Sequence, residues 1–129
     1  MQSVLIIDDD PAGTQLLMTL LGFEGYQACR LEDWRDPVSD VEKVRPDLVI
    51  MDVYLRTRNG FDLLSQLRAH PDPGVARTPV LMMSAEDYGA RCKQAGANAF
   101  LAKPFSIRAL MATIHEIEEE VNESPNERV

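Results

Sequence analysis

The 129-residue sequence predicts a single α/β domain, a (βα)5 doubly wound sheet of five parallel strands. Two observations support this fold class. Short apolar runs at residues 4–7 and 48–51 have the length and unbroken hydrophobicity of strands that are buried on both faces. The segments between such runs place apolar residues at helical spacing, most clearly over residues 106–121. This alternation is typical of parallel sheets covered by helices.

The first half of the chain is expected to contain three strands and two helices. The strands are expected at residues 3–8, 26–31 and 48–52. The first helix should begin at Pro11, with Asp10 placed to cap it, and end at the glycines of 22–25. The second should begin near Pro37 and stop before Pro46. The side chains expected to face the core from these helices are Leu16, Leu17, Leu20, Leu21, Val38, Val41 and Val44.

The second half continues the alternation. After Gly60 a helix is expected to face inward with Phe61, Leu64 and Leu67, and turn residues at 70–74 predict a loop. The next elements are expected as strands at 79–84 and 99–103 and helices at 87–95 and 106–121. In the last helix Ser106 is placed to cap, and the inward side chains should be Ile107, Leu110, Met111, Ile114, Ile117 and Val121. We assign residues 1–121 to the domain and 122–129 to a flexible acidic tail or the start of a linker.

The charge of the chain limits its partners. A net charge of -8 and a pI near 4.7 argue against direct binding to nucleic acid or to an anionic membrane, because both require a basic face. No apolar stretch approaches the ~20 residues of a membrane span, and the N-terminus lacks the basic region of a signal peptide. A cytoplasmic protein is therefore expected, with Cys29 and Cys92 as reduced thiols. The single tryptophan, Trp34, begins a polar stretch and receives no role from the sequence.

Acidic residues mark the carboxyl ends of two predicted strands. Asp8, Asp9 and Asp10 follow the first strand, and Asp52 closes the third. Open α/β sheets bind ligands along this edge. Carboxylates gathered there repel one another, so the site must keep a proton or hold a cation. Because Mg²⁺ is bound by one or two carboxylates with water and phosphate oxygens, we interpret the cluster as a Mg²⁺ site.

Four motifs follow one another along nearly the whole chain. They are IIDDDP at residues 6–11, PDLVIMD at 46–52 with Asn59-Gly60, PVLMMSA at 79–85, and AGA at 95–97 leading to KPF at 103–105. In this order they resemble the receiver domain, of the chemotaxis-receiver type, found in the response regulators of two-component signal transduction. The resemblance implies a flavodoxin-like receiver fold. It also implies a phosphorylation switch that catalyses only its own phosphoryl transfer and dephosphorylation.

The resemblance assigns roles to the acidic residues. It implies that Asp52 accepts a phosphoryl group and that Asp8 and Asp9 hold Mg²⁺ together with Asp52. The backbone carbonyl of Tyr54 matches a further metal ligand. These residue types also suit the chemistry on their own terms, because a carboxylate can attack phosphorus to give an acyl phosphate. Catalysis of such a transfer depends mostly on positioning and charge stabilisation.

Ser84, Phe100 and Lys103 complete the implied machinery. Lys103 matches the lysine that offsets charge on the phosphoryl oxygens, and the resemblance favours a cis bond between it and Pro104. Ser84 matches the hydroxyl residue that bonds a phosphoryl oxygen. Phe100 matches the switch aromatic, which packs inward when that hydroxyl moves, and it replaces the commoner tyrosine. Such a switch requires contacts that differ between the two states.

The implied partner is a histidine kinase or a histidine phosphotransfer protein, with output to a downstream effector or to a C-terminal domain missing from this chain. Two other classes stay open. A phosphatase of the haloacid dehalogenase type needs a second carboxylate two residues after the nucleophile, where this chain has Tyr54. A receiver-like interaction module that is never phosphorylated is disfavoured by the intact acidic, hydroxyl and lysine residues.

Two departures from the family pattern concern the surroundings of the site. Arg56 stands where the family commonly has a proline. The segment from Ser84 to Lys103 is about three residues shorter than usual, which is nearly one helical turn. The helix at 87–95 is therefore expected to be short.

Overall fold

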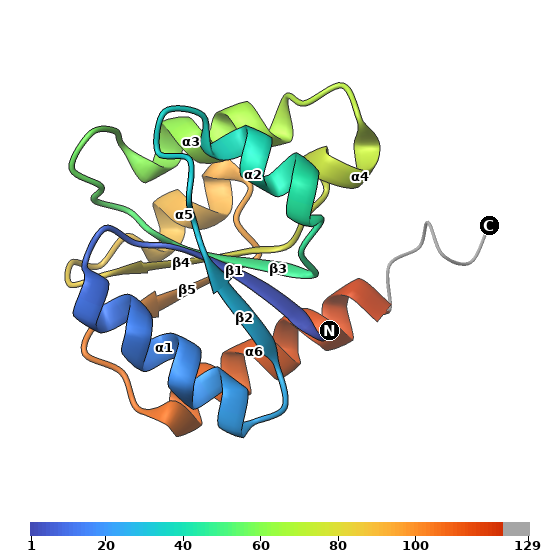
Figure 1. Cartoon of the computed structure of the whole chain (residues 1–129). Helices are drawn as coiled ribbons and strands as arrows, with labels where there is room; N and C mark the ends of the chain where they lie inside the picture. The colour runs from blue at the N-terminus through green and yellow to red at the C-terminus, as the bar shows by residue number, and fades with distance from the viewer. Residues whose placement is uncertain (123–129) are drawn as a thin grey trace.

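The computed structural model describes residues 1–122, which form a five-stranded parallel sheet with helices on both faces (Figure 1). The strands are β1 (Ser3–Ile7), β2 (Gln27–Arg30), β3 (Leu48–Asp52), β4 (Val80–Ser84) and β5 (Ala99–Ala102). Their order in the sheet is β2-β1-β3-β4-β5, and every pairing is parallel. This is the strand order of flavodoxin-like doubly wound sheets, so the predicted fold class is confirmed.

The helices pack on the two faces of the sheet, and a separate apolar core lies on each face. The helices are α1 (Pro11–Phe23), α2 (Pro37–Val44), α3 (Gly60–Arg68), α4 (Pro73–Ala76), α5 (Gly89–Ala95) and α6 (Ile107–Asn122). Successive strand residues point to opposite faces. In β1, Val4 and Ile6 therefore pack with α1 and α6, whereas Leu5 and Ile7 pack with α2, α3 and α5 (Figure 1).

The helix starts follow local sequence signals. Pro11 occupies the first position of α1, and Asp10 takes the N-cap position, where its backbone carbonyl accepts the Thr14 N–H at 2.9 Å. The Asp10 carboxylate caps no N–H of α1, a helix that is described in full. The Ser106 hydroxyl oxygen accepts the Ala109 N–H at 3.0 Å, so the predicted cap of α6 is confirmed.

Three side chains expected to face inward are exposed, namely Leu16, Val44 and Ile107. In α1 the buried positions are Thr14, Leu17 and Leu21, so Leu16 falls on the opposite side of the helix and is 59% exposed. Thr14 faces inward because its hydroxyl donates to the Asp8 carbonyl at 3.1 Å. The other two lie at helix ends, since α2 ends at Val44 and α6 begins at Ile107.

The segment expected as a loop at 70–74 contains the start of α4. Its first turn is capped by Asp72, whose carboxylate accepts the Gly74 N–H, and its Val75 is buried. The short turn forms because it buries this one apolar side chain. The helix expected at 87–95 is confirmed as short, with seven residues from Gly89. The expected tail lies outside the described residues, apart from Asn122, which ends α6.

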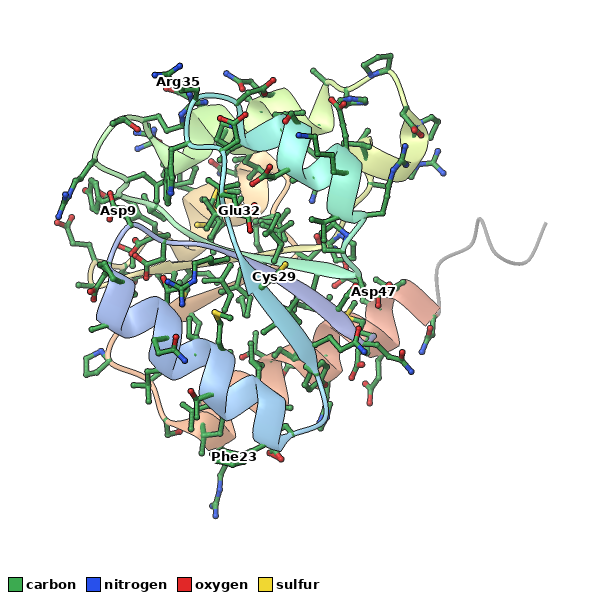
Figure 2. All side chains as sticks on the ribbon, viewed as in Figure 1. Asp9, Phe23, Cys29, Glu32, Arg35 and Asp47 are labelled. Atoms are coloured by element: carbon green, nitrogen blue, oxygen red, sulfur yellow. The ribbon has the colours of Figure 1, made fainter. Side chains whose placement is uncertain are left out.

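Two side chains tie distant segments together away from the acidic edge. The half-buried guanidinium of Arg68 donates to the backbone carbonyls of Ala76, Thr78 and Gly96 and to the side chain of Asn98. Asp47 precedes β3, and its carboxylate accepts the N–H groups of Gln2 and Ser3 at 2.8 and 3.0 Å. Figure 2 shows Asp9 and Asp47 on opposite sides of the molecule, near opposite ends of the strands.

Cys29 is half-buried and Cys92 is buried, and both thiols are free. None of the helices described within residues 1–122 combines the length and the hydropathy that a membrane span requires.

Candidate functional site

The candidate site lies at the carboxyl edge of the sheet. Asp8 follows β1, Asp52 and Ser84 are the last residues of β3 and β4, and Lys103 follows β5. The side chains of Asp8, Asp52 and Ser84 are buried although they are polar. Buried polar groups require bonding partners, and here those partners come from neighbouring strand ends and loops. The parallel topology thus gathers residues that are far apart in the sequence.

Lys103 links the two buried carboxylates. Its Nζ lies 2.6 Å from Oδ2 of Asp52 and 3.6 Å from Oδ2 of Asp8. Burial alone would lower the pKa of Lys103, but the hydrogen bond and charge of Asp52, with the charge of Asp8, outweigh it and raise this pKa. Lys103 therefore stays a cation beside Asp52 at neutral pH.

The acidic pair after β1 is held by backbone N–H groups. Asp8 Oδ1 accepts the Asp10 N–H at 3.0 Å, and the Asp9 carboxylate accepts the Arg56 N–H. Burial raises the pKa of Asp8, and the charge of Asp52 acts in the same direction, whereas the Asp10 N–H and Lys103 oppose it. The bond to Arg56 fixes Asp9 to the loop that follows β3.

The loop between β3 and α3 closes tightly over Asp52. The Tyr54 N–H donates to Asp52 Oδ1 at 3.2 Å, and the Gly60 N–H donates to the Val53 carbonyl at 2.8 Å. A Cβ atom added to Gly60 would lie 2.5 Å from the Asp52 carbonyl oxygen. Only glycine permits this approach, so Gly60 of the Asn59-Gly60 motif allows the loop to pack closely against the end of β3.

The carboxylates of Asp8, Asp9 and Asp52 are the donors available to a metal. Among the described residues, no three His, Cys, Asp or Glu side chains converge into a complete ligand set. One reason is that Asp9 bonds to the Arg56 N–H, while Lys103 contacts the other two carboxylates. Mg²⁺ needs only one or two carboxylates, with other oxygens and water completing its shell, so this donor set fits it.

A phenolic cluster lies beside the site. The hydroxyls of Tyr54 and Tyr88 contact each other, and the Tyr88 hydroxyl donates to Glu86 Oε2 at 3.1 Å. The hydrogen bond with Tyr54, followed by desolvation and the bond to Glu86, raises the pKa of Tyr88 to about 12. The Tyr88 ring also packs edge-on against Phe61. The sequence analysis did not single out Tyr88. Its position four residues after Ser84 could have indicated that it lies near the site.

The two predicted switch residues lie on neighbouring strands. The Ser84 hydroxyl oxygen accepts the Glu86 N–H at 3.1 Å. Phe100 is half-buried, pairs with Met82 across β4 and β5, and packs against the core on the side of α3 and α5. The Lys103–Pro104 bond is cis, as the resemblance implied.

The site combines an acidic pair after β1, a buried aspartate at the end of β3, a hydroxyl residue at the end of β4 and a lysine after β5. This is the arrangement of a receiver-type phosphorylation domain. Residues 4–115 match the family model of the response regulator receiver domain. The chain therefore belongs to this family. Receiver domains are phosphorylation switches of two-component signalling, so the phosphatase alternative finds no support.

Individual relatives agree with this assignment. The chain is 33% identical over 116 residues to the DNA-binding response regulator MtrA of Mycolicibacterium smegmatis, covering 88% of the chain and 49% of MtrA. It is 32% identical over 117 residues to the sensory/regulatory protein RpfC of Xanthomonas campestris, covering 88% of the chain and 16% of RpfC. The chain thus spans half or less of these curated relatives.

Solved structures of response regulators share the fold. The chemotaxis response regulator CheY4 of Vibrio cholerae superposes with a TM-score of 0.80 at 28% identity, covering 91% of this chain and 98% of that one. A putative response regulator from Chloroflexus aurantiacus gives a TM-score of 0.81 at 31% identity, covering 90% of this chain and 96% of that one.

Proposed function

We propose that the protein is a two-component switch in which Asp52 accepts a phosphoryl group from the phosphohistidine of a histidine kinase or a histidine phosphotransfer protein. The contact between Lys103 Nζ and Asp52 Oδ2, at 2.6 Å on the open edge of the sheet, carries this proposal. It places a fixed cation beside a buried carboxylate. Charge stabilisation of this kind is the main requirement of phosphoryl transfer.

In the proposed transfer, a carboxylate oxygen of Asp52 attacks the phosphorus atom. The O–P bond forms as the P–N bond to the histidine ring breaks, and the ring leaves as neutral imidazole because its other nitrogen keeps a proton. Lys103 then lies beside the new phosphoryl oxygens. The Ser84 oxygen already accepts the Glu86 N–H, so its hydroxyl hydrogen is available to a phosphoryl oxygen.

Receiver domains of this family generally bind Mg²⁺ at the phosphorylation site. We assign Asp9 and Asp52 as its direct ligands, Asp8 as a looser one, and the Tyr54 backbone carbonyl as a further donor. When bound, Mg²⁺ neutralises charge on the phosphoryl oxygens. The all-oxygen donor set and the unfavourable burial of charge at Asp8 support a cation here.

We assign the conformational response to Ser84 and Phe100. Movement of Ser84 toward a phosphoryl group would change the packing between β4 and β5, where the Phe100 ring is half-buried. This difference in contacts would bias the switch. Output through a downstream effector or a missing C-terminal domain, a cytoplasmic location, and the absence of direct nucleic-acid or membrane binding stay predictions. The tail at 122–129 also stays a prediction.

The test is incubation with Mg²⁺ and phosphoramidate, followed by intact mass measurement. One labile phosphoryl group is expected on the wild type and on Asp62→Asn, which changes an exposed carboxylate of α3. Asp52→Asn should gain none, and Asp9→Asn should lose the phosphorylation that depends on Mg²⁺. An unmodified wild type would instead favour the interaction module that is never phosphorylated.

A further inference from the structure

A cleft borders Asp8 and Asp9 on the side of β2. It has a volume of about 330 Å³, and its lining includes Arg30, Leu31, Trp34, Arg56 and Thr57 as well as the acidic pair after β1. Asp52 does not line it, so the cleft is distinct from the phosphoacceptor position. Its volume lies at the lower end of the range of small-molecule sites, about 300–1,000 Å³. The cleft therefore has room for a ligand the size of one ring and a substituent.

Two cations in this cleft have no acidic partner among residues 1–122. Arg30 donates to the Gln15 side-chain oxygen at 2.9 Å. The Arg56 side chain makes no hydrogen bond or ion pair with any described residue, since only its backbone N–H bonds to Asp9. Among the arginines of residues 1–122 only Arg45 forms an ion pair, so what distinguishes Arg30 and Arg56 is that both line one cleft, which suits an anionic ligand. The planar guanidinium fork matches phosphate oxygens in particular.

Besides the two arginines, the cleft has an aromatic wall, and a hydrogen bond connects the two loops that form its sides. Trp34 is half-buried, with part of its ring against the core, and it also lines the cleft. An indole face beside arginine side chains suits a planar ring. Arg58 donates to the Arg35 carbonyl at 3.3 Å, which ties the loop after β3 to the loop that carries Trp34. The two walls are thus held in one arrangement.

We propose that this cleft binds a small aromatic anion, one planar ring that bears a phosphate group. The ring lies on Trp34, and the phosphate pairs with Arg30 and Arg56. The carboxylates of Asp8 and Asp9 border the cleft and repel an anion, so binding should strengthen when Mg²⁺ offsets their charge. By reciprocity the ligand should raise the affinity for Mg²⁺. This coupling rests on the proposed metal site, whereas the binding itself does not.

The test uses the full chain and phenylphosphonate, which has a ring and a phosphate-like group but donates no phosphoryl group. Trp34 is the only tryptophan of the chain, so its fluorescence reports occupancy of the cleft. We expect saturable binding that is stronger with Mg²⁺. Arg56→Gln should raise the Kd about tenfold, the effect of losing one charge-assisted contact. The matched control is Arg35→Gln, which should leave the Kd unchanged. Arg35 follows Trp34 in the sequence, and its side chain is exposed (Figure 2) and lies outside the lining of the cleft.

Each other outcome overturns part or all of the proposal. A wild type without a saturable response, or equal weakening by Arg56→Gln and Arg35→Gln, overturns the site. Equal affinity for inorganic phosphate, measured by calorimetry, overturns the aromatic part. Binding that is independent of Mg²⁺ overturns the coupling. No phosphodonor is present in these titrations, so the result is separate from whether Asp52 accepts a phosphoryl group.

Discussion

Replacement of Gly60 by alanine tests the close approach of the β3–α3 loop to the end of β3, where Asp52 lies. The added Cβ would lie 2.5 Å from the Asp52 carbonyl oxygen and 3.0 Å from both Cα and the carbonyl oxygen of Val53. These are backbone atoms, so no side-chain rotation relieves the overlap. Overpacking of this kind costs about 1–3 kcal/mol, and weakening the 2.8 Å bond from the Gly60 N–H to Val53 adds about 1 kcal/mol. Alanine regains less than about 1 kcal/mol in helix propensity.

We therefore expect Gly60→Ala to lower the free energy of unfolding by about 2–3 kcal/mol. The assay is urea unfolding followed by Trp34 fluorescence. In a separate thermal unfolding experiment, followed by circular dichroism, the midpoint should fall by roughly 5–10 °C. Phosphorylation should slow as well, because the loop must move away from Asp52. The matched control is Gly22→Ala in α1, where the added Cβ meets nothing within 4 Å beyond its chain neighbours and its own helix backbone. That variant should gain about 0.5–1 kcal/mol. Equal stability of the two variants would refute the reasoning.

Three further predictions concern other parts of the molecule. Tyr54→Asn should speed the loss of the phosphoryl group from Asp52, because we expect the exposed Tyr54 ring to screen a phosphoryl group there from an in-line water; phosphoprotein decay in Mg²⁺, followed by mass, that is no faster than in the wild type would show that Tyr54 gives no shielding. Arg68→Met should cost about 1–3 kcal/mol by leaving the part-buried carbonyls of Ala76 and Thr78 without this donor, whereas the exposed Arg77→Met should cost little; equal urea midpoints would contradict this role. Backbone N–H groups hold the pKa of Asp47 below its usual value. The ionised Asp47 carboxylate therefore stabilises the fold fully above its pKa in the unfolded chain, which is about 4. This stabilisation is lost as the pH falls through the pKa of Asp47 in the folded protein. The stability difference between wild type and Asp47→Ala, measured by urea unfolding at about pH 7 and pH 3, should shrink at the lower pH; a constant difference would count against the assignment.

The sequence alone determined the alternation of strands and helices, apart from the short α4, and which polar residues stand at the strand ends. Asp52 and Ser84 close apolar runs, and Ser106 precedes a helical pattern, because strand hydrophobicity and capping act over a few neighbouring residues. In a parallel sheet the carboxyl ends of all strands lie at one edge, so placing Asp8 and Lys103 at the ends of their strands was enough to predict that they share that edge.

Only the tertiary structure decided which groups touch across that edge. Tyr88 reaches Tyr54, and Arg56 shares a cleft with Trp34, across loops whose separation is set by the strand order and the lengths of the connections. Likewise, Leu16 is exposed because the bond from Thr14 to the end of β1 fixes the rotation of α1. Periodicity fixes which positions share a helix face, but long-range contacts choose which face meets the sheet.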